Sequence, residues 1–223
     1  DSSQSRGLGD VYKRQYWWEL ICIGTKRIIA ESGIRNNQIT GIGISYQMHG
    51  LVIVDEDGNC LRNSIIWCDG RAVEIGNKAF KEIGEEKCCS NLLNSPGNFT
   101  ASKLAWVKNN EPEIYDRIYK FMLPGDFLNF KLTGEVNSTV TGLSEGMFWD
   151  FKENCTADWL LNYYQIDSSL TPNIVENFRD QGYVTKLASE KTGLPIGIPV
   201  KYRSGDQPNN AVALNVLNVG EVA

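Results

Sequence analysis

The chain has 223 residues, of which 42% are hydrophobic and 22% charged, and its formal net charge is −5. This length suits one large domain or two small ones, and the composition excludes global disorder. The negative charge argues against general nucleic-acid binding, which needs a basic surface, and no apolar run approaches the ~18 residues of a membrane-spanning helix.

The first fifteen residues do not resemble native protein. The stretch SRGLGDVYKRQ (Ser5–Gln15) matches the in-frame translation of a transposase-type sequencing adapter, and residues 1–4 would come from the bases before it. The alternative is a native basic tail, which eleven consecutive matches disfavour. We therefore expect residues 1–15 to be an adapter-derived, non-native segment, and we exclude them from the fold prediction.

Hydrophobic periodicity and turn residues predict alternating helices and strands in the rest of the chain. In chain order we predict a helix at 17–31, a strand at 38–45, a hairpin at 51–62, helices at about 72–84, 101–109, 112–119, 126–132 and 157–164, a short helix at 185–195, a strand at 196–202 and a last helix at 208–218. Such alternation without long linkers predicts one α/β domain with a mixed sheet.

Glycine, aspartate and proline residues mark the predicted boundaries. Gly33 suits a left-handed helix C-cap, and Asp57-Gly58 suits the hairpin turn. Asp126 is expected to cap the helix that Gly134 ends. Pro208 suits the first turn of the last helix.

The cysteine pattern favours free thiols. The six cysteines stand at 22, 60, 68, 88, 89 and 155, without a CxxC pair or a metal-binding rhythm. Disulfide frameworks belong mainly to small secreted domains, so we expect reduced thiols and a cytoplasmic protein. A secreted, disulfide-bonded glycan binder stays open as an alternative, because Asn98, Asn137 and Asn154 stand in glycosylation acceptor patterns.

Asp206 stands where a strand gives way to a helix, in YRSGDQPNNAVAL. An aspartate two residues before a proline is a common N-cap, which stabilises a helix by about 1 kcal/mol. Alternatively, its carboxylate lies at the carboxyl end of a strand, where α/β sheets bind their ligands. There it would accept a proton from an alcohol, while the helix dipole keeps it ionised. The two roles are compatible.

The only histidine, His49, follows Gln47 and Met48. A lone histidine beside apolar residues is commonly part of the core. The alternative is a sugar site, in which a neutral imidazole and a neighbouring amide hydrogen-bond several hydroxyl groups. Gly50 favours the site slightly, because glycine permits a ligand to approach the backbone closely.

A third candidate segment, WCDGR, contains Trp67, Asp69 and Arg71. It reads either as a strand end with a surface ion pair, worth about 0–1 kcal/mol, or as a tryptophan face against a sugar. We assign Phe99 and Trp149 to the core. No phosphate-binding P-loop, zinc spacing or Ser-His-Asp order is present.

The order and spacing of seven segments resemble the N-terminal half of the FGGY carbohydrate kinases, most closely the xylulokinases. They are YWWEL, GIGISYQMHGLVIVDEDG, IIWCDGRA, SPGNFTASKLAWVKNNEPEIYDRI, FMLPGDFLNFKLTGE, GLSEGMFWD and SGDQPNNAVALNVLNVGE. The similarity extends from about Tyr16 to Ala223. The fold it implies is a ribonuclease-H-like domain of the actin/hexokinase superfamily, incomplete at both ends.

The resemblance also implies a reaction and a site. ATP, with Mg²⁺, would phosphorylate a small ketose, D-xylulose being favoured, to give D-xylulose 5-phosphate. Asp206 matches the family's catalytic base, Met48 and His49 match its ketose-binding pair, and Gln207 holds the position of a polar substrate contact. The substrate-binding residues we expect are Gln47, Met48, His49, Trp67, Asp69 and Gln207.

The chain departs from the family pattern in four ways. The opening strand pair with its phosphate loop and the second, nucleotide-binding domain are both absent from 16–223. Asp206-Gln207 also stands where Asp-Asn is usual, and Cys68 where asparagine is common. We expect no metal or nucleotide site here, an inactive chain, and poor folding caused by an unpaired sheet edge. Other FGGY kinases, of the gluconate, ribulose or glycerol type, a non-catalytic sugar-binding domain and a homodimer of the full-length protein stay open.

Overall fold

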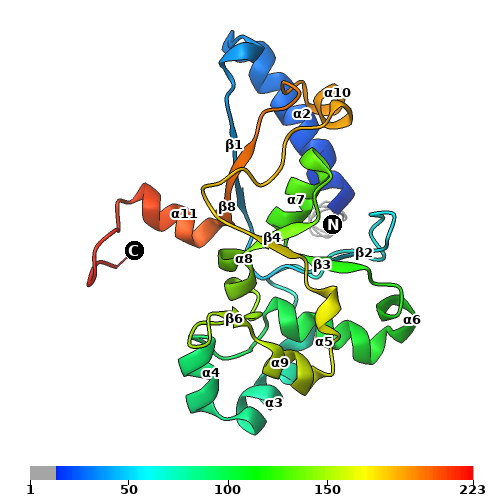
Figure 1. The fold of residues 1–223 in the computed structure, drawn as a ribbon, viewed down its shortest axis with the longest axis vertical. Helices are drawn as coiled ribbons and strands as arrows, with labels where there is room; N and C mark the ends of the chain where they lie inside the picture. The colour runs from blue at the N-terminus through cyan, green and yellow to red at the C-terminus, as the bar shows by residue number, and fades with distance from the viewer. Residues whose placement is uncertain (1–13, 223) are drawn as a thin grey trace, which may run out of the picture.

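Two parallel strands, β1 (Ile42–Tyr46) and β8 (Val200–Gly205), run side by side although they lie near opposite ends of the chain (Figure 1). The computed structural model describes residues 14–222. Ile44 and Tyr46 of β1 are buried, and Gly43 and Ser45, which alternate with them, are exposed, as the two-residue period of a strand requires. Because Tyr46 pairs with Gly205, the segments that follow the two strands emerge at the same edge.

Helices and three further strand pairs make up the rest of the described fold. The helices are α2 (Arg14–Ser32), α3 (Val73–Ile83), α4 (Glu85–Asn91), α5 (Thr100–Asn110), α6 (Pro112–Tyr115), α7 (Pro124–Thr133), α8 (Val140–Glu145), α9 (Asp158–Tyr164), α10 (Lys186–Thr192) and α11 (Asp206–Ala213), with short 3-10 turns η1 (Asn36–Gln38), η2 (Gly70–Ala72) and η3 (Ser168–Leu170). The strand pairs are β2 (Val52–Val54) with β3 (Lys120–Met122), β4 (Asn137–Thr139) with β7 (Asn173–Val175), and β5 (Trp149–Asp150) with β6 (Cys155–Thr156). The predicted mixed α/β fold is confirmed, with both parallel and antiparallel pairs.

The hydrophobic core consists of two clusters, and the segment after β1 connects them. Tyr46 packs in one cluster with Phe127 of α7. Leu51 packs in the other, where the rings of Phe121 and Phe148 stack with centroids 4.1 Å apart. The turn at 47–50 is therefore anchored at both of its ends.

The helices predicted at 17–31, 72–84, 101–109, 126–132, 157–164 and 185–195 are confirmed with small shifts in their ends. Gly33, Gly58 and Gly134 have the positive φ angles that their predicted turns and caps require, 68°, 75° and 79°. None of the described helices is both long and apolar enough to cross a bilayer. All six cysteines are free.

Several predicted boundaries are wrong because tertiary pairing overrides the local pattern. The helix predicted at 112–119 ends at Tyr115, because the chain then forms β3 against β2. The return arm of the hairpin at 51–62 consequently makes only an isolated bridge, between Val54 and Cys60. The strand expected at 38–45 begins at Ile42, and the last helix begins two residues before Pro208.

Asp126 caps α7 from the third helical position rather than from the N-cap position. The N-cap residue is Leu123, and Oδ2 of Asp126 accepts a hydrogen bond from its backbone N–H, 3.1 Å away. Its side chain is only 1% exposed and forms a 3.0 Å ion pair with Arg203 of β8. This aspartate therefore joins α7 to β8.

The predicted adapter segment, 1–15, lies outside the described residues except for Arg14 and Gln15, which begin α2.

Candidate functional site

A cavity of about 400 Å³ lies where the turn after β1, helix α8 and the start of α11 meet. Its lining includes Met48, His49, Phe99, Glu145, Gln207 and Pro208. The structure thus brings together three of the predicted substrate-binding residues from opposite ends of the chain. Parallel pairing of β1 with β8 produces this arrangement, since both segments leave the same sheet edge.

His49 is half-buried and presents its ring to the cavity. Its backbone lies in the left-handed region, with φ 61°, and its ring packs edge-on against Phe99 with centroids 4.4 Å apart. Nδ1 lies 2.9 Å from the backbone oxygen of Glu145. A carbonyl can only accept, so Nδ1 carries the proton. Burial lowers the pKa of His49, and the positive charge of Lys103 lowers it further, so the ring is neutral at pH 7 and Nε2 is a hydrogen-bond acceptor.

Lys103 of α5 anchors the turn at 47–50, which contains His49. Its Nζ donates to the backbone oxygens of His49, at 2.7 Å, and Ile66, at 3.0 Å. The side chain is fully buried, and that burial lowers its pKa to about 8. Lys103 therefore ties the turn after β1 to the segment that leads into Trp67.

Lys103 should make the stability of the protein depend on pH. Its pKa is about 8 in the folded protein, against 10.5 ordinarily, so between these values only the unfolded chain keeps the proton. The free energy of unfolding then rises with pH across this window. We expect the difference between wild type and Lys103→Met, measured by urea denaturation, to increase by about 2 kcal/mol in favour of wild type from about pH 8 to about pH 9.5. A difference that stays constant or shrinks would contradict this.

Asp206 is the first residue of α11, and Gly205 occupies the N-cap position, so the predicted N-cap is off by one residue. The Oδ1 atom of Asp206 accepts from the backbone N–H of Gln207 at 3.1 Å. Its negative charge favours the protonated forms of both His49 and Glu145. For His49 this effect is smaller than the effect of burial, which lowers the pKa. The residue is half-buried and does not itself line the cavity, whereas the next residue, Gln207, does.

Two glycines near the cavity are required by close packing. A Cβ on Gly205 would lie 2.2 Å from Cγ of Met48 and 2.7 Å from Oε2 of Glu145. A Cβ on Gly50 would lie 2.6 Å from Cγ of Pro124. The close approach predicted at Gly50 therefore exists, but Pro124 makes it rather than a ligand.

Phe99 and Glu145 are among the cavity-lining residues that were not identified from the sequence. Phe99, which we assigned to the core, does pack against it and also lines the cavity against His49. Glu145, the last residue of α8, was not considered at all, because no motif or periodicity marks it. Burial raises its pKa well above the usual range, and the charge of Asp126 adds to this.

Trp67 and Asp69 do not line the cavity, contrary to our expectation. Trp67 is 60% exposed, and the Asp69 carboxylate forms a bidentate ion pair with Arg71, at 2.9 and 2.7 Å. The ion pair expected between Asp69 and Arg71 is therefore present, and a sugar contact of Trp67 or Asp69 stays a prediction. Gln47 is half-buried and is also absent from the cavity lining.

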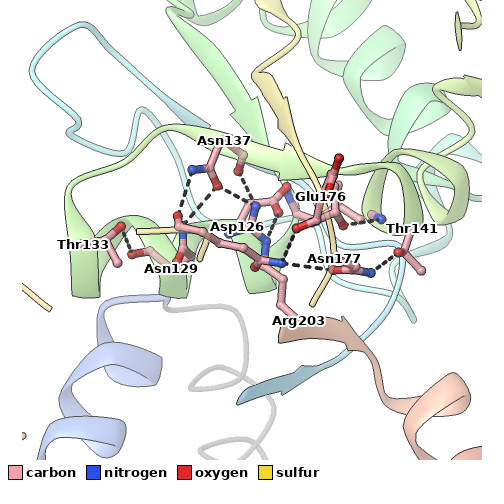
Figure 2. A network of polar contacts seen from close by, with 12 residues as sticks. Asp126, Asn129, Thr133, Asn137, Thr141, Glu176, Asn177 and Arg203 are labelled. Atoms are coloured by element: carbon pink, nitrogen blue, oxygen red, sulfur yellow. Dashed lines mark hydrogen bonds and ion pairs between the residues drawn. The ribbon is translucent and has the colours of Figure 1, made fainter. Parts of the chain in front are cut away.

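A buried polar network fixes β8 behind the site. Figure 2 shows the Arg203 side chain between Asp126 and Asn137. Arg203 Nη2 donates to the backbone oxygen of Asn137, at 3.0 Å, and to its Oδ1, at 2.6 Å. Arg203 lies three residues before Asp206, so the network sets the position from which the carboxylate emerges.

Among the described residues, no group of three or more His, Cys, Asp or Glu side chains is arranged to hold a metal ion.

Comparisons with known proteins identify related sequences and structures. Residues 11–213 match the family model described as the FGGY family of carbohydrate kinases, N-terminal domain. A xylulose kinase of Staphylococcus xylosus is 34% identical over 198 residues, which are 88% of this chain and 40% of that protein. A probable L-xylulose kinase of Haemophilus influenzae is 33% identical over 82% of this chain and 38% of that protein.

The crystal structure of xylulose kinase from Rhodospirillum rubrum superimposes with a TM-score of 0.84 and 27% identity, over 93% of this chain and 43% of that one. The chain thus spans about 40% of the length of the curated relatives it matches.

Proposed function

The chain belongs to the FGGY family of carbohydrate kinases, and from that premise we propose that it forms the sugar-binding part of an ATP-dependent ketose kinase. Its fold is the actin/hexokinase-like α/β fold of that family. The favoured substrate is D-xylulose and the product D-xylulose 5-phosphate. The observation that supports the proposal is the cavity lined by Met48, His49 and Gln207, the residue that directly follows Asp206.

In this proposal Asp206 is the general base. An alcohol is a weak nucleophile, and a carboxylate within reach of its proton contributes about 10²–10⁴-fold to the rate. The position of Asp206 at the start of α11 stabilises its negative charge. Because the phosphoryl-transfer transition state is loose, the chain's main contribution is to hold the acceptor hydroxyl in line.

His49 and Gln207 orient the sugar. The Nε2 atom of the neutral imidazole accepts a hydrogen bond from one hydroxyl group, and the exposed Gln207 amide can both donate and accept. Met48 gives the C–H face of the sugar an apolar contact. These groups come from the turn after β1 and from α11, so the pairing of β1 with β8 determines their spacing.

We further propose that ATP and Mg²⁺ bind largely through residues outside 14–222. ATP supplies the phosphoryl group, and Mg²⁺ neutralises the charge that develops on it. Residues 1–223 alone should then consume no ATP in the presence of D-xylulose, and measurable turnover by the purified chain would refute this.

The experiment that tests the function is a substrate panel with the full-length gene product. ATP consumption would be measured with D-xylulose, L-xylulose, D-ribulose, gluconate and glycerol. We expect the highest kcat/KM with D-xylulose. If another sugar of the panel gives the highest kcat/KM, the proposed substrate is wrong and the kinase activity stands. If a sugar binds without turnover, the protein is a non-catalytic sugar-binding domain and not a kinase.

Replacing His49 should mainly weaken sugar binding. His49→Ala removes the Nε2 acceptor and is expected to cost about 1–3 kcal/mol of binding free energy, measured by calorimetry with D-xylulose. Trp67→Ala is the comparison variant, since Trp67 lies outside the cavity lining, and its affinity should match wild type. If Trp67→Ala loses affinity and His49→Ala does not, the sugar binds at the segment 67–71 and not in the cavity.

A further inference from the structure

Glu145 lies at the wall of the cavity, between the turn after β1 and the end of β8. It is the last residue of α8 and lines the cavity beside Met48. Its backbone oxygen accepts the hydrogen bond from Nδ1 of His49 at 2.9 Å, and its Oε2 lies against Gly205, where a Cβ would be only 2.7 Å away. The carboxyl group is thus held between the two segments that we propose bind the sugar.

One oxygen of this carboxyl group is left without a partner. The side chain of Glu145 is 8% exposed, and within the described residues its Oε1 is buried and makes no hydrogen bond. Leaving a buried polar atom unpaired costs about 1–3 kcal/mol, and such atoms are uncommon in native proteins. Glu145 lines the cavity, so a ligand that fills the cavity is the candidate partner of this carboxyl group.

The surroundings of Glu145 favour the neutral form of its carboxyl group. Burial disfavours a charge there, and the carboxylates of Asp126 and Asp206 oppose a further negative charge. Hydrogen bonding of the carboxyl group with the backbone of His49 and with the side chain of Tyr46 favours ionisation, but it does not outweigh burial. A neutral carboxyl group carries an O–H and can therefore donate as well as accept.

We propose that Glu145 is a further substrate-binding residue, whose neutral carboxyl group donates a hydrogen bond to an oxygen atom of the sugar held between Met48 and Gln207. This inference rests on the proposed function, because it takes the cavity to be the sugar site. It assigns the three polar groups different roles: Asp206 and Nε2 of His49 accept hydrogen bonds, whereas Glu145 donates one. A sugar must then present donors and an acceptor in a matching order.

The test compares two substitutions that separate shape, charge and hydrogen bonding. Glu145→Gln keeps the size and a neutral donor, and Glu145→Leu removes all polar atoms. In the full-length gene product we expect the Kd for D-xylulose, measured by calorimetry, to stay within about threefold of wild type for Glu145→Gln and to rise about 10- to 100-fold for Glu145→Leu. Glu145→Met replaces the leucine variant if that variant fails to fold in a thermal melt.

Asp150→Asn is the matched control, because it makes the same carboxyl-to-amide change at a buried residue outside the cavity. Asp150 accepts hydrogen bonds from Asn91 and Trp159, both at 2.8 Å, so this variant should lose stability and keep its sugar affinity. Wild-type affinity in the apolar variant would overturn the contact, and a Glu145→Gln variant as weak as the leucine variant would overturn the neutral donor. If wild type itself binds none of the sugars, the proposed function fails together with this inference.

Discussion

Asp206→Asn in the full-length gene product should lower kcat by about 10²–10⁴-fold. The substitution keeps the size of the side chain and an oxygen able to accept from the backbone N–H of Gln207, so the start of α11 should stay intact. It removes the group that accepts the proton of the sugar hydroxyl. Because asparagine can still hydrogen-bond that hydroxyl, the Kd for D-xylulose should change little. Steady-state kinetics and calorimetry on the same preparation would separate the two effects.

Asp158→Asn provides a matched control for this experiment. Asp158 is also the first residue of its helix, α9, and, unlike Asp206, it has no sequence neighbour that lines the cavity. Its substitution tests whether loss of an aspartate at a helix start is enough to slow the reaction, and we expect no change in kcat. If instead Asp206→Asn raises KM and leaves kcat unchanged, Asp206 binds the substrate without acting as the base.

The sequence predicted the components of the site better than their arrangement. Met48, His49, Gln207 and Asp206 were singled out from local composition and from the family resemblance. Their proximity depends on the parallel pairing of β1 with β8, and no local pattern reveals which distant strands pair. Trp67 and Asp69 were equally plausible ligand contacts from the sequence. In the structure the carboxylate of Asp69 is paired with Arg71.

What the sequence could not predict lies mainly in short elements. Strands of two or three residues, such as β4 and β5, and the six residues of α8 are too short to show a period. Glu145 was missed for that reason. The prediction for Asp126 was incomplete for another reason. Its position near a helix start suggested a cap, but its buried ion-pair partner, Arg203, lies far away in the sequence.

Arg203→Met should cost about 3–5 kcal/mol of unfolding free energy, because it leaves the Asp126 carboxylate buried without its counter-charge. Both side chains are almost fully buried, at 0% and 1% exposure, and water cannot replace the lost guanidinium there. The backbone oxygen and Oδ1 of Asn137 lose their donor as well. Urea denaturation of the 223-residue chain and of the variant would measure the difference.

The double variant Arg203→Met/Asp126→Leu tests whether the unpaired charge is the cause. Replacing both members of a buried ion pair by apolar residues is often nearly neutral, so the double variant should recover most of the stability that Arg203→Met loses. Arg27→Met is the surface control: Arg27 pairs with Glu31 at 2.7 Å, but both side chains are largely exposed, and the expected loss is about 1 kcal/mol or less. If the double variant is no more stable than Arg203→Met, the cost comes from the hydrogen bonds to Asn137 rather than from the charge, and the position of Asp206 then depends on that amide.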